Sequence, residues 1–391
     1  MNKFIANSVV SGKITPPSSK SMLQRSIAAS VLSNKETTII YNSTCDDSTA
    51  ALNIAKELGA KIENISDGIR IQGGFYPISN ELNFGESGLA LRMFTPILAL
   101  FDTEFIIKTD GSLSNRPAME IKYPLKGGVF EVDGYVTSQF LTGLLMALPM
   151  VKEDSVVNVT DLKSKPYIDM TLEVLESFGV KIKNENYEKF IVKGDQSYSA
   201  KEIAIENDWS GASNFIVVGA IAGNVEILGL NINSNQPDKN ILNIVRSVGA
   251  NVEVRENSIL ISKEKLQAFT YDATDSPDLF PPLVVLASAC NGISIIQGVS
   301  RLRYKESDRP EVLLKEFTKL GINISIAGDG MIIEGGKVIG GKLDPHNDHR
   351  IAMAGAVAGL ISEKGVNIKN AECVNKSYPR FFKDLEKIID N

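Results

Sequence analysis

The amino-acid sequence predicts a mixed α/β (α+β) protein assembled from like supersecondary units. Three observations predict this class: the chain has 391 residues, one helix-and-hairpin pattern recurs along it, and a second kind of helix is apolar nearly all round. A chain of this length exceeds a single ordinary hydrophobic core, so two domains are expected. Hydrophobic residues make up 43% of the chain and charged residues 23%, which is typical of globular proteins.

The recurring pattern is an amphipathic helix, a glycine, and two short strands joined by a polar turn. A glycine after the last apolar residue suits a helix end, and a polar turn between short apolar runs predicts a hairpin. Four copies span residues 51–73, 171–194, 241–262 and 312–335, with their glycines at Gly59, Gly179, Gly249 and Gly321. A truncated copy, a helix end followed by a shortened hairpin, is expected at residues 123–134.

The second kind of helix starts with polar or charged residues and continues with apolar and small ones. A helix that is apolar nearly all round is buried on nearly all sides. Such helices are predicted behind Ser19 and within residues 87–100, 137–150, 210–223, 276–289 and 349–360. The repetition indicates a fold built from similar units, but it does not show whether these units form a solenoid or two compact lobes.

Charge and cysteine content limit the classes of partner. The net charge of −6 makes a nucleic-acid or anionic-membrane surface unexpected as a global property, so any cationic site must be local. Cys45, Cys290 and Cys373 are far apart and odd in number, which indicates a reducing compartment. The chain opens on no signal stretch and contains no apolar run of about 18 residues, so a cytoplasmic protein is expected.

Cations gather at the starts of the predicted buried helices. Lys20 and Arg25 lie in the first two turns behind Ser19, where the helix dipole already disfavours positive charge. Other helix starts carry cations or hydroxyl and amide groups: Arg116, Ser138, Gln139, Ser164, Tyr167 and Arg350. Capping explains a single serine or proline there, but cations at several starts indicate an anion site if the helix ends converge.

Residues 304–312, YKESDRPEV, strengthen this hypothesis. Lys305 and Arg309 are four residues apart and are expected on one helical face. Glu306 and Asp308 either pair with these cations or transfer protons beside a bound phosphate, and the spacing leaves both interpretations open.

Two other motifs do not predict a nucleotide-binding or metal-binding site. Residues 336–342 match the start of a P-loop, but Leu343 stands where that motif needs Ser or Thr. His346 and His349 are the only histidines and lack nearby cysteines, so no metal site is predicted.

The same residues resemble a known family, the 5-enolpyruvylshikimate-3-phosphate synthases, over essentially the whole chain. Nine motifs occur in register, and together they are far more specific than any one of them. They are S-K-S-x-x-x-R from Ser19, G-x-x-G-x-x-x-R from Gly85, R-P at Arg116, S-Q-F-L-T from Ser138, S-K-P-Y-I from Ser164, P-D-L from Pro277, K-E-S-D-R from Lys305, N-D-H-R-x-A-M from Asn347 and K-S-Y-P from Lys376.

The resemblance implies two lobes, each of three βαβαββ-type units whose buried helices point their N-termini at an interlobe cleft. One lobe would be residues 16–205, on the shikimate 3-phosphate side. The other would combine 1–15 with 206–391, on the phosphoenolpyruvate side. The implied reaction transfers the enolpyruvyl group of phosphoenolpyruvate to the 5-hydroxyl of shikimate 3-phosphate and releases phosphate. No metal or organic cofactor is implied, and the family expectation is a monomer.

The resemblance also implies roles for individual residues. Asp278 would take the hydroxyl proton, since its place at a helix start keeps it ionised, and Glu306, Lys20 and Lys376 are candidates for the other proton transfers. The implied shikimate 3-phosphate ligands are Lys20, Ser21, Arg25, Thr137, Ser138, Gln139, Ser164, Tyr167, Asp278 and Lys305. The implied phosphoenolpyruvate ligands are Lys20, Gly88, Arg116, Gln139, Arg309, Arg350 and Lys376.

Two departures from the family pattern stand out. Glu86 occupies a position where the family often has Asn, so its carboxylate either points away, pairs with a cation such as Arg92, or weakens anion binding. Thr137 replaces a serine and keeps the hydroxyl.

The same residues disfavour three alternative functions. The sister transferase acting on UDP-N-acetylglucosamine usually has Lys-Asn near its start and a loop cysteine, whereas this chain has Lys20-Ser21 and no cysteine in residues 110–117. RNA 3'-phosphate cyclase uses related repeats, but the acidic chain lacks a nucleotide motif. A non-catalytic anion-binding homologue would lose the acid–base set, and here Asp278, Glu306, Lys20 and Lys376 are all present.

Overall fold

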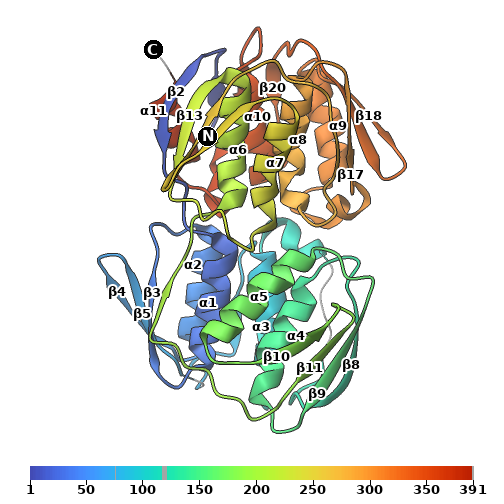
Figure 1. Ribbon diagram of the computed structural model, residues 1–391. Coiled ribbons are helices and arrows are strands. Elements are labelled where there is room, and N and C mark those ends of the chain that lie inside the picture. Colours follow the sequence, from blue (N-terminus) through green and yellow to red (C-terminus); the bar gives the residue numbers. More distant parts are fainter. Residues whose placement is uncertain (75, 117–120, 390–391) are drawn as a thin grey trace. The chain divides into compact units, whose positions relative to one another are not determined.

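The computed structural model describes residues 1–74, 76–116 and 121–389 and confirms the mixed α/β class (Figure 1). The chain divides into two compact units, each with its own hydrophobic core. We call Ser18–Glu206 the continuous unit, and Met1–Pro17 together with Asn207–Asn391 the discontinuous unit. None of the helices in the described ranges is both long enough and apolar enough to cross a membrane.

The four complete hairpins predicted from the sequence are confirmed. The amphipathic helices before them are α2 (Asp46–Glu57), α5 (Lys165–Ser177), α7 (Ile241–Ser247) and α9 (Arg309–Lys319). The antiparallel pairs are β4 (Lys61–Ile65) with β5 (Gly68–Gln72), β10 (Ile182–Glu185) with β11 (Lys189–Val192), β14 (Asn251–Val254) with β15 (Ser258–Ser262), and β18 (Asn323–Ala327) with β19 (Gly330–Glu334). The glycine between each helix and its hairpin has φ between +81° and +102°, a conformation that side chains disfavour.

Each hairpin belongs to a four-stranded sheet, and all four sheets have one topology. Two parallel strands lie side by side, and the hairpin pairs antiparallel with the second of them. The parallel pairs are β12 (Glu202–Ala204) with β3 (Glu36–Ile40), β8 (Gly128–Asp133) with β9 (Ser155–Thr160), β2 (Val10–Ile14) with β13 (Gly223–Leu228), and β16 (Thr270–Asp272) with β17 (Ile293–Gln297). The sheet pattern is therefore one unit repeated.

Two smaller sheets contain parts of the same unit. In one, β20 (Gly341–Leu343) and β21 (Val366–Ile368) are parallel, and β1 (Lys3–Ile5) pairs antiparallel with β21. In the other, β6 (Glu81–Asn83) and β7 (Ile106–Lys108) form a parallel pair. The predicted hairpin at residues 123–134 is wrong, because the described part of this segment contains a single strand, β8. That strand pairs with β9 and so begins the next unit; a short alternating pattern does not identify its partner strand.

The predicted buried helices form the interior of each unit. The continuous unit contains α1 (Lys20–Leu32), α3 (Gly88–Leu98) and α4 (Gln139–Ala147), and the discontinuous unit contains α6 (Trp209–Ala222), α8 (Phe280–Ser288) and α10 (His349–Gly359). In Figure 1, α6, α8 and α10 lie side by side, with sheets outside them. The last helix, α11 (Phe381–Ile388), packs against β2.

Both passages of the chain between the units fall at the same point of the repeat. Strand β2 belongs to the discontinuous unit, and the helix that follows it, α1, belongs to the continuous unit. At the second passage, strand β12 belongs to the continuous unit, and the helix that follows it, α6, belongs to the discontinuous unit. The first strand and the buried helix of these two repeats are thus exchanged, and each unit keeps a full set of buried helices.

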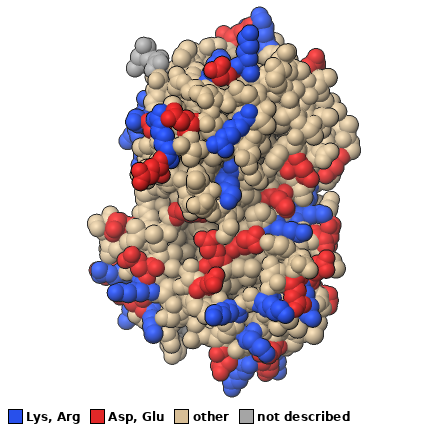
Figure 2. All heavy atoms as spheres, in the orientation of Figure 1, with Lys and Arg blue, Asp and Glu red and all other residues tan. Residues whose placement is uncertain are grey.

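On the face shown in Figure 2, charged side chains are scattered among other residues, and Lys and Arg are interspersed with Asp and Glu. Salt bridges among exposed residues, such as Arg255 with Glu253 at 2.9 Å, are of the weak, solvent-screened kind.

Close packing of α6 against β15 depends on Gly219. A Cβ added there would lie 2.8 Å from the Cβ of Ile261 and 3.0 Å from its carbonyl oxygen, so backbone would have to move. Gly336 in the same unit has open space where a Cβ would be. The two glycines make a matched pair for testing the packing.

We predict that Gly219→Ala lowers the free energy of unfolding by about 1–2 kcal/mol, because overpacking outweighs the gain in helix propensity. Trp209 is the only tryptophan and is fully buried in the discontinuous unit, so its fluorescence in urea reports this unfolding. Gly336→Ala is the control and should change the midpoint little. Equal midpoints for the two variants would contradict the packing argument.

Candidate active site

The starts of three buried helices meet inside the continuous unit. The Nη1 of Arg92, on α3, donates to the Oε1 of Gln139, the first residue of α4, at 2.8 Å. Ser87, the N-cap of α3, donates from its hydroxyl to the Oε1 of Gln24 on α1 at 3.1 Å. The helix ends that the sequence predicted to carry functional groups are therefore neighbours within this unit.

Arg25 is buried in this cluster with neutral partners. Its Nε donates to the hydroxyl of Thr171 at 2.9 Å, its Nη1 to the carbonyl of Ser21 at 2.9 Å, and its Nη2 to the carbonyl of Tyr167 at 3.2 Å. Only 1% of the residue is exposed, and burial lowers the pKa of Arg25 to about 10, so it stays charged at neutral pH. No carboxylate of the described residues forms an ion pair with it, and a buried cation of this kind favours an anionic ligand.

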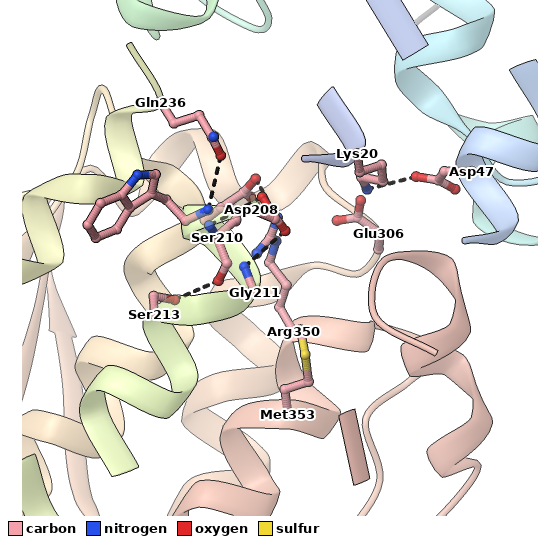
Figure 3. A network of polar contacts seen from close by, with 12 residues as sticks. Lys20, Asp47, Asp208, Ser210, Gly211, Ser213, Gln236, Glu306, Arg350 and Met353 are labelled. Carbon is pink, nitrogen blue, oxygen red and sulfur yellow. Dashed lines mark hydrogen bonds and ion pairs between the residues drawn. The ribbon is translucent and has the colours of Figure 1, made fainter. Parts of the chain in front are cut away.

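Lys20 has an anionic partner within the chain. Its Nζ lies 2.8 Å from the Oδ2 of Asp47 in the first turn of α2, as Figure 3 shows. Both side chains are mostly buried. Sequence analysis missed Asp47, because a carboxylate in the first turn of an amphipathic helix is explained by the helix dipole alone.

The start of α3 faces two guanidinium groups. A Cβ added at Gly88 would lie 2.9 Å from the Nη1 of Arg92 and 3.2 Å from the Nη1 of Arg116. Arg116 follows the short 3-10 helix η1 (Gly111–Asn115) and donates to the hydroxyl of Ser112 at 2.7 Å. Pro117, the other half of the R-P motif, lies outside the described residues. Gly88 therefore lets both guanidinium groups reach the backbone at a positively polarised helix end.

The carboxylate of Glu86 packs against η1. A Cβ added at Gly111, where φ is +54°, would lie 2.5 Å from the Oε2 of Glu86. The residue that departs from the family pattern thus contacts the loop that carries Arg116, and Gly111 makes the room for it.

The remaining predicted ligands of this unit lie at the starts of α4 and α5. The Thr137 hydroxyl accepts from the backbone N–H of Gln139 at 3.2 Å. Ser138 and Ser164 are the N-cap residues of α4 and α5, and both are buried. Ser164 has φ of +57°, a left-handed conformation that is uncommon for serine and indicates a locally constrained backbone. Tyr167 lies in the first turn of α5.

In the discontinuous unit, Arg309 is fully buried among three carboxylates. Its Nε lies 3.0 Å from the Oδ2 of Asp348, its Nη2 lies 2.6 Å from the Oε2 of Glu306, and its Nη1 lies 3.3 Å from the Oδ1 of Asp278. Burial lowers the pKa of Arg309, but Asp348, Glu306 and Asp278 outweigh it and raise the pKa above the usual value. This network joins α8, α9 and α10 through their starting residues.

Asp278 lies between two guanidinium groups. It belongs to the 3-10 helix η4 (Pro277–Leu279) just before α8, and its Oδ2 lies 2.8 Å from the Nη2 of Arg350. Burial acts to raise the pKa of Asp278, but Arg350, Lys305 and Arg309 outweigh it and hold the pKa well below the usual range. The low pKa keeps the carboxylate ionised, and in this arrangement it is a weak base.

Lys305 and Lys376 complete the predicted set. Burial, then the charge of Arg309 and Arg301, lowers the pKa of Lys305 to about 8, although Asp278 and Glu306 act against this. The Nζ of Lys376 donates to the carbonyl of Asn347 at 2.6 Å, one residue before the Asp348 cap of α10. Lys376 is mostly buried.

The expectation that Lys305 and Arg309 share one helical face is wrong. Helix α9 begins at Arg309, and Lys305 is an extended residue at the end of the 3-10 helix η5 (Ser300–Tyr304). The side chain of Asp308 caps α9 by accepting from the N–H of Glu311 at 3.4 Å, and Pro310 suits the first turn. The helix therefore starts too late to include Lys305.

Comparison with known proteins agrees with this architecture. The EPSP synthase (3-phosphoshikimate 1-carboxyvinyltransferase) family model matches residues 6–126 and 118–385. A structure of EPSP synthase from Acinetobacter baumannii superposes with a TM-score of 0.81 at 26% identity, covering 99% of this chain and 98% of that one. The enolpyruvyl transferase NikO from Streptomyces tendae shares the fold, with a TM-score of 0.75 at 15% identity over 100% of this chain and 97% of that one. The fold is thus that of the enolpyruvyl transferases.

Curated relatives narrow the assignment. The 3-phosphoshikimate 1-carboxyvinyltransferase of Clostridium perfringens strain 13 is 38% identical over 413 residues, covering 98% of this chain and 97% of the relative. That of Clostridium novyi is 37% identical over 422 residues, covering 99% and 97%. The chain belongs to the EPSP synthase family. Its activity is that of a 3-phosphoshikimate 1-carboxyvinyltransferase in the shikimate pathway to aromatic amino acids.

We predict that Arg309→Met lowers the free energy of unfolding by about 3–5 kcal/mol, because it leaves buried carboxylates without their cation. Urea denaturation followed by Trp209 fluorescence measures the change.

Arg255→Met is the matched control, since Arg255 pairs with Glu226 and Glu253 at the surface. Its loss should change the free energy of unfolding very little. A cost for Arg309→Met as small as that of the control would show that the buried network is not structural.

Proposed function

We propose that the continuous unit supplies most of the shikimate 3-phosphate site. The ligands are hydroxyls, amides and cations at the starts of α1, α4 and α5, with further contacts from the discontinuous unit. They are Lys20, Ser21, Arg25, Thr137, Ser138, Gln139, Ser164 and Tyr167, together with Asp278 and Lys305. We also propose that the enzyme acts as a monomer, as the family resemblance implies.

The observation that carries this proposal is Arg25. It is a buried guanidinium whose hydrogen bonds go to a hydroxyl and two carbonyls, with no ion pair from the described residues. Desolvating a cation is costly unless an anion offsets it. A phosphorylated or otherwise anionic substrate group beside Arg25 would supply that charge, and hydrogen bonds that involve charged groups are among the strongest in proteins.

We assign the phosphoenolpyruvate site to Lys20, Gly88, Arg116 and Gln139 of the continuous unit and to Arg309, Arg350 and Lys376 of the discontinuous unit. The substrate carries a carboxylate and a phosphate, both of which match the planar donor fork of arginine. Gly88 supports the assignment because its bare backbone adjoins two guanidinium groups. Helix starts add their N–H groups and dipoles to the same field.

The proposed chemistry is addition followed by elimination. Asp278 takes the proton of the 5-hydroxyl group while the hydroxyl oxygen bonds to the second carbon of phosphoenolpyruvate. The methylene carbon of phosphoenolpyruvate gains a proton in the same addition. The intermediate then loses a proton from the new methyl group as its bond to phosphate breaks. Glu306, Lys20 and Lys376 are the candidates for these carbon proton transfers, and preorganised cations stabilise the intermediate, which carries negative charge on its carboxylate and phosphate groups.

Substrate binding would also activate Asp278. Without an anionic substrate, Arg350 and Arg309 pair with this carboxylate and lower its basicity. Anionic groups of phosphoenolpyruvate on the same guanidiniums would share their charge. The pKa of Asp278 would then rise toward the range where a general base works well.

Turnover is tested by mixing the purified chain with both substrates and measuring phosphate release. Activity with shikimate 3-phosphate, and none with UDP-N-acetylglucosamine in its place, is expected. Turnover with UDP-N-acetylglucosamine but not with shikimate 3-phosphate would overturn the substrate assignment. No phosphate release with either acceptor would favour a non-catalytic anion-binding homologue.

We predict that Arg25→Met raises the KM for shikimate 3-phosphate about 10- to 100-fold, the loss expected for one charge-assisted contact. Steady-state kinetics with each substrate varied in turn measures this, and the KM for phosphoenolpyruvate should change far less.

Thermal unfolding followed by circular dichroism controls for structure. Because Arg25 has no ion-pair partner to leave behind, Arg25→Met should cost less stability than Arg309→Met. Equal effects on both KM values would argue against a specific role for Arg25.

We predict that Gly88→Ala raises the KM for phosphoenolpyruvate about tenfold or more, because the new methyl displaces the guanidiniums of Arg92 and Arg116 by a fraction of an ångström or more. Gly336→Ala is the control, with open space at its Cβ. An unchanged KM for phosphoenolpyruvate in Gly88→Ala would remove Gly88 and Arg116 from that site.

A further inference from the structure

Asp238 is a buried carboxyl group that the proposed mechanism does not use. It lies on the short 3-10 helix η3 (Pro237–Asn240) of the discontinuous unit, with 2% of the residue exposed. Among the described residues its Oδ1 has no hydrogen-bond partner, and it forms no ion pair. Buried carboxylates are normally paired, so this one requires an explanation.

The charged and titratable neighbours of Asp238 come from four other elements. They are Asp208, the N-cap of α6; Asp278 on η4; Arg350 on α10; and Tyr271 on β16. The Ser210 hydroxyl also lies beside it, without a hydrogen bond of good geometry. Figure 3 shows the Arg350 side chain extending toward Asp208 and Ser210 at the start of α6.

The charge balance around Arg350 disfavours an ionised Asp238. Arg350 is the one cation of this group, and its Nη2 already pairs with Asp278 at 2.8 Å. Asp208 also lies here, and its carboxylate accepts from the N–H groups of Ser210 and Gly211 and caps α6. A third carboxylate charge here would have no cation of its own. Burial, followed by the charge of Asp278, raises the pKa of Asp238 to about 7, against the opposing effect of Arg350.

We propose that Asp238 is a positioning residue whose carboxyl group is protonated in the active enzyme, and whose ionisation weakens the hold of Arg350 on phosphoenolpyruvate. This rests on the proposed role of Arg350 in binding that substrate. A neutral Asp238 leaves one carboxylate, Asp278, in competition with the substrate for the guanidinium. An ionised Asp238 adds a second competitor and repels the incoming anion.

The direct test compares the pH dependence of the KM for phosphoenolpyruvate in wild type and Asp238→Asn. Asparagine has the shape of the protonated acid and cannot ionise. The wild-type KM should rise severalfold more than the variant's between about pH 6 and about pH 8.5, because only the wild type gains the charge. Phosphoenolpyruvate titrates identically in both assays, so the ratio of the two KM values isolates Asp238.

Asp384→Asn is the matched control. Asp384 is also buried in the discontinuous unit, but it pairs with Lys387 at 2.7 Å and Arg380 at 3.3 Å on α11. Its variant should follow the wild-type pH profile of KM. Superimposable profiles for wild type and Asp238→Asn would overturn the proposal.

Unfolding without substrate tests the ionisation separately from the proposed function. The folded-state pKa of Asp238 is raised above its unfolded value, so its contribution to stability is present at low pH and is lost as pH rises through about 7. The melting temperature of Asp238→Asn relative to wild type should therefore increase from about pH 5 to about pH 8. A constant difference overturns the proposal, whereas a failed Arg350 or Gly88 assignment would leave this melting result intact.

Discussion

The protein depends on holding buried positive charge at helix starts inside its two units, where the helix dipole, desolvation and mutual repulsion all oppose it. The two units meet this constraint differently. In the discontinuous unit, Arg309 and Arg350 are balanced by Asp278, Glu306 and Asp348. In the continuous unit, Arg25 has neutral acceptors in place of carboxylates. The first arrangement neutralises the buried cations within the chain, and the second surrounds a buried cation with neutral acceptors.

The repeated unit explains how such helix starts come together. Each copy places a buried helix after its first strand, so three copies in a unit bring three helix starts to neighbouring positions. Direct side-chain contacts then join them, as from Arg92 to Gln139 and from Ser87 to Gln24. The passages of the chain between the units fall between strand and helix, which preserves this grouping in both. A site that needs many donors is thereby built from residues remote in sequence.

The carboxyl groups of the discontinuous unit have different roles, and the residues around each group determine its role. Asp348 and Asp208 cap helices through backbone N–H groups, and Asp348 also holds Arg309. Asp278 pairs with two guanidiniums and is kept ionised. Asp238, with no cation left for it, holds its proton more tightly. Residues of one type, within one network, therefore have pKa values displaced in opposite directions.

The mixed α/β class, the four complete hairpins and the buried helices could be predicted from the sequence alone, because periodicity, apolar content and glycine position are local properties of the chain. The sequence also shows which residue types stand at the helix starts, and thus the family. The pairings depend on how the elements pack in three dimensions: Asp47 with Lys20, Thr171 with Arg25, and the strand β8 with β9. The structure also shows that Lys305 lies outside α9. Such partners are set by which elements pack together, and no local pattern records the partner of a strand or the counter-charge of a buried cation.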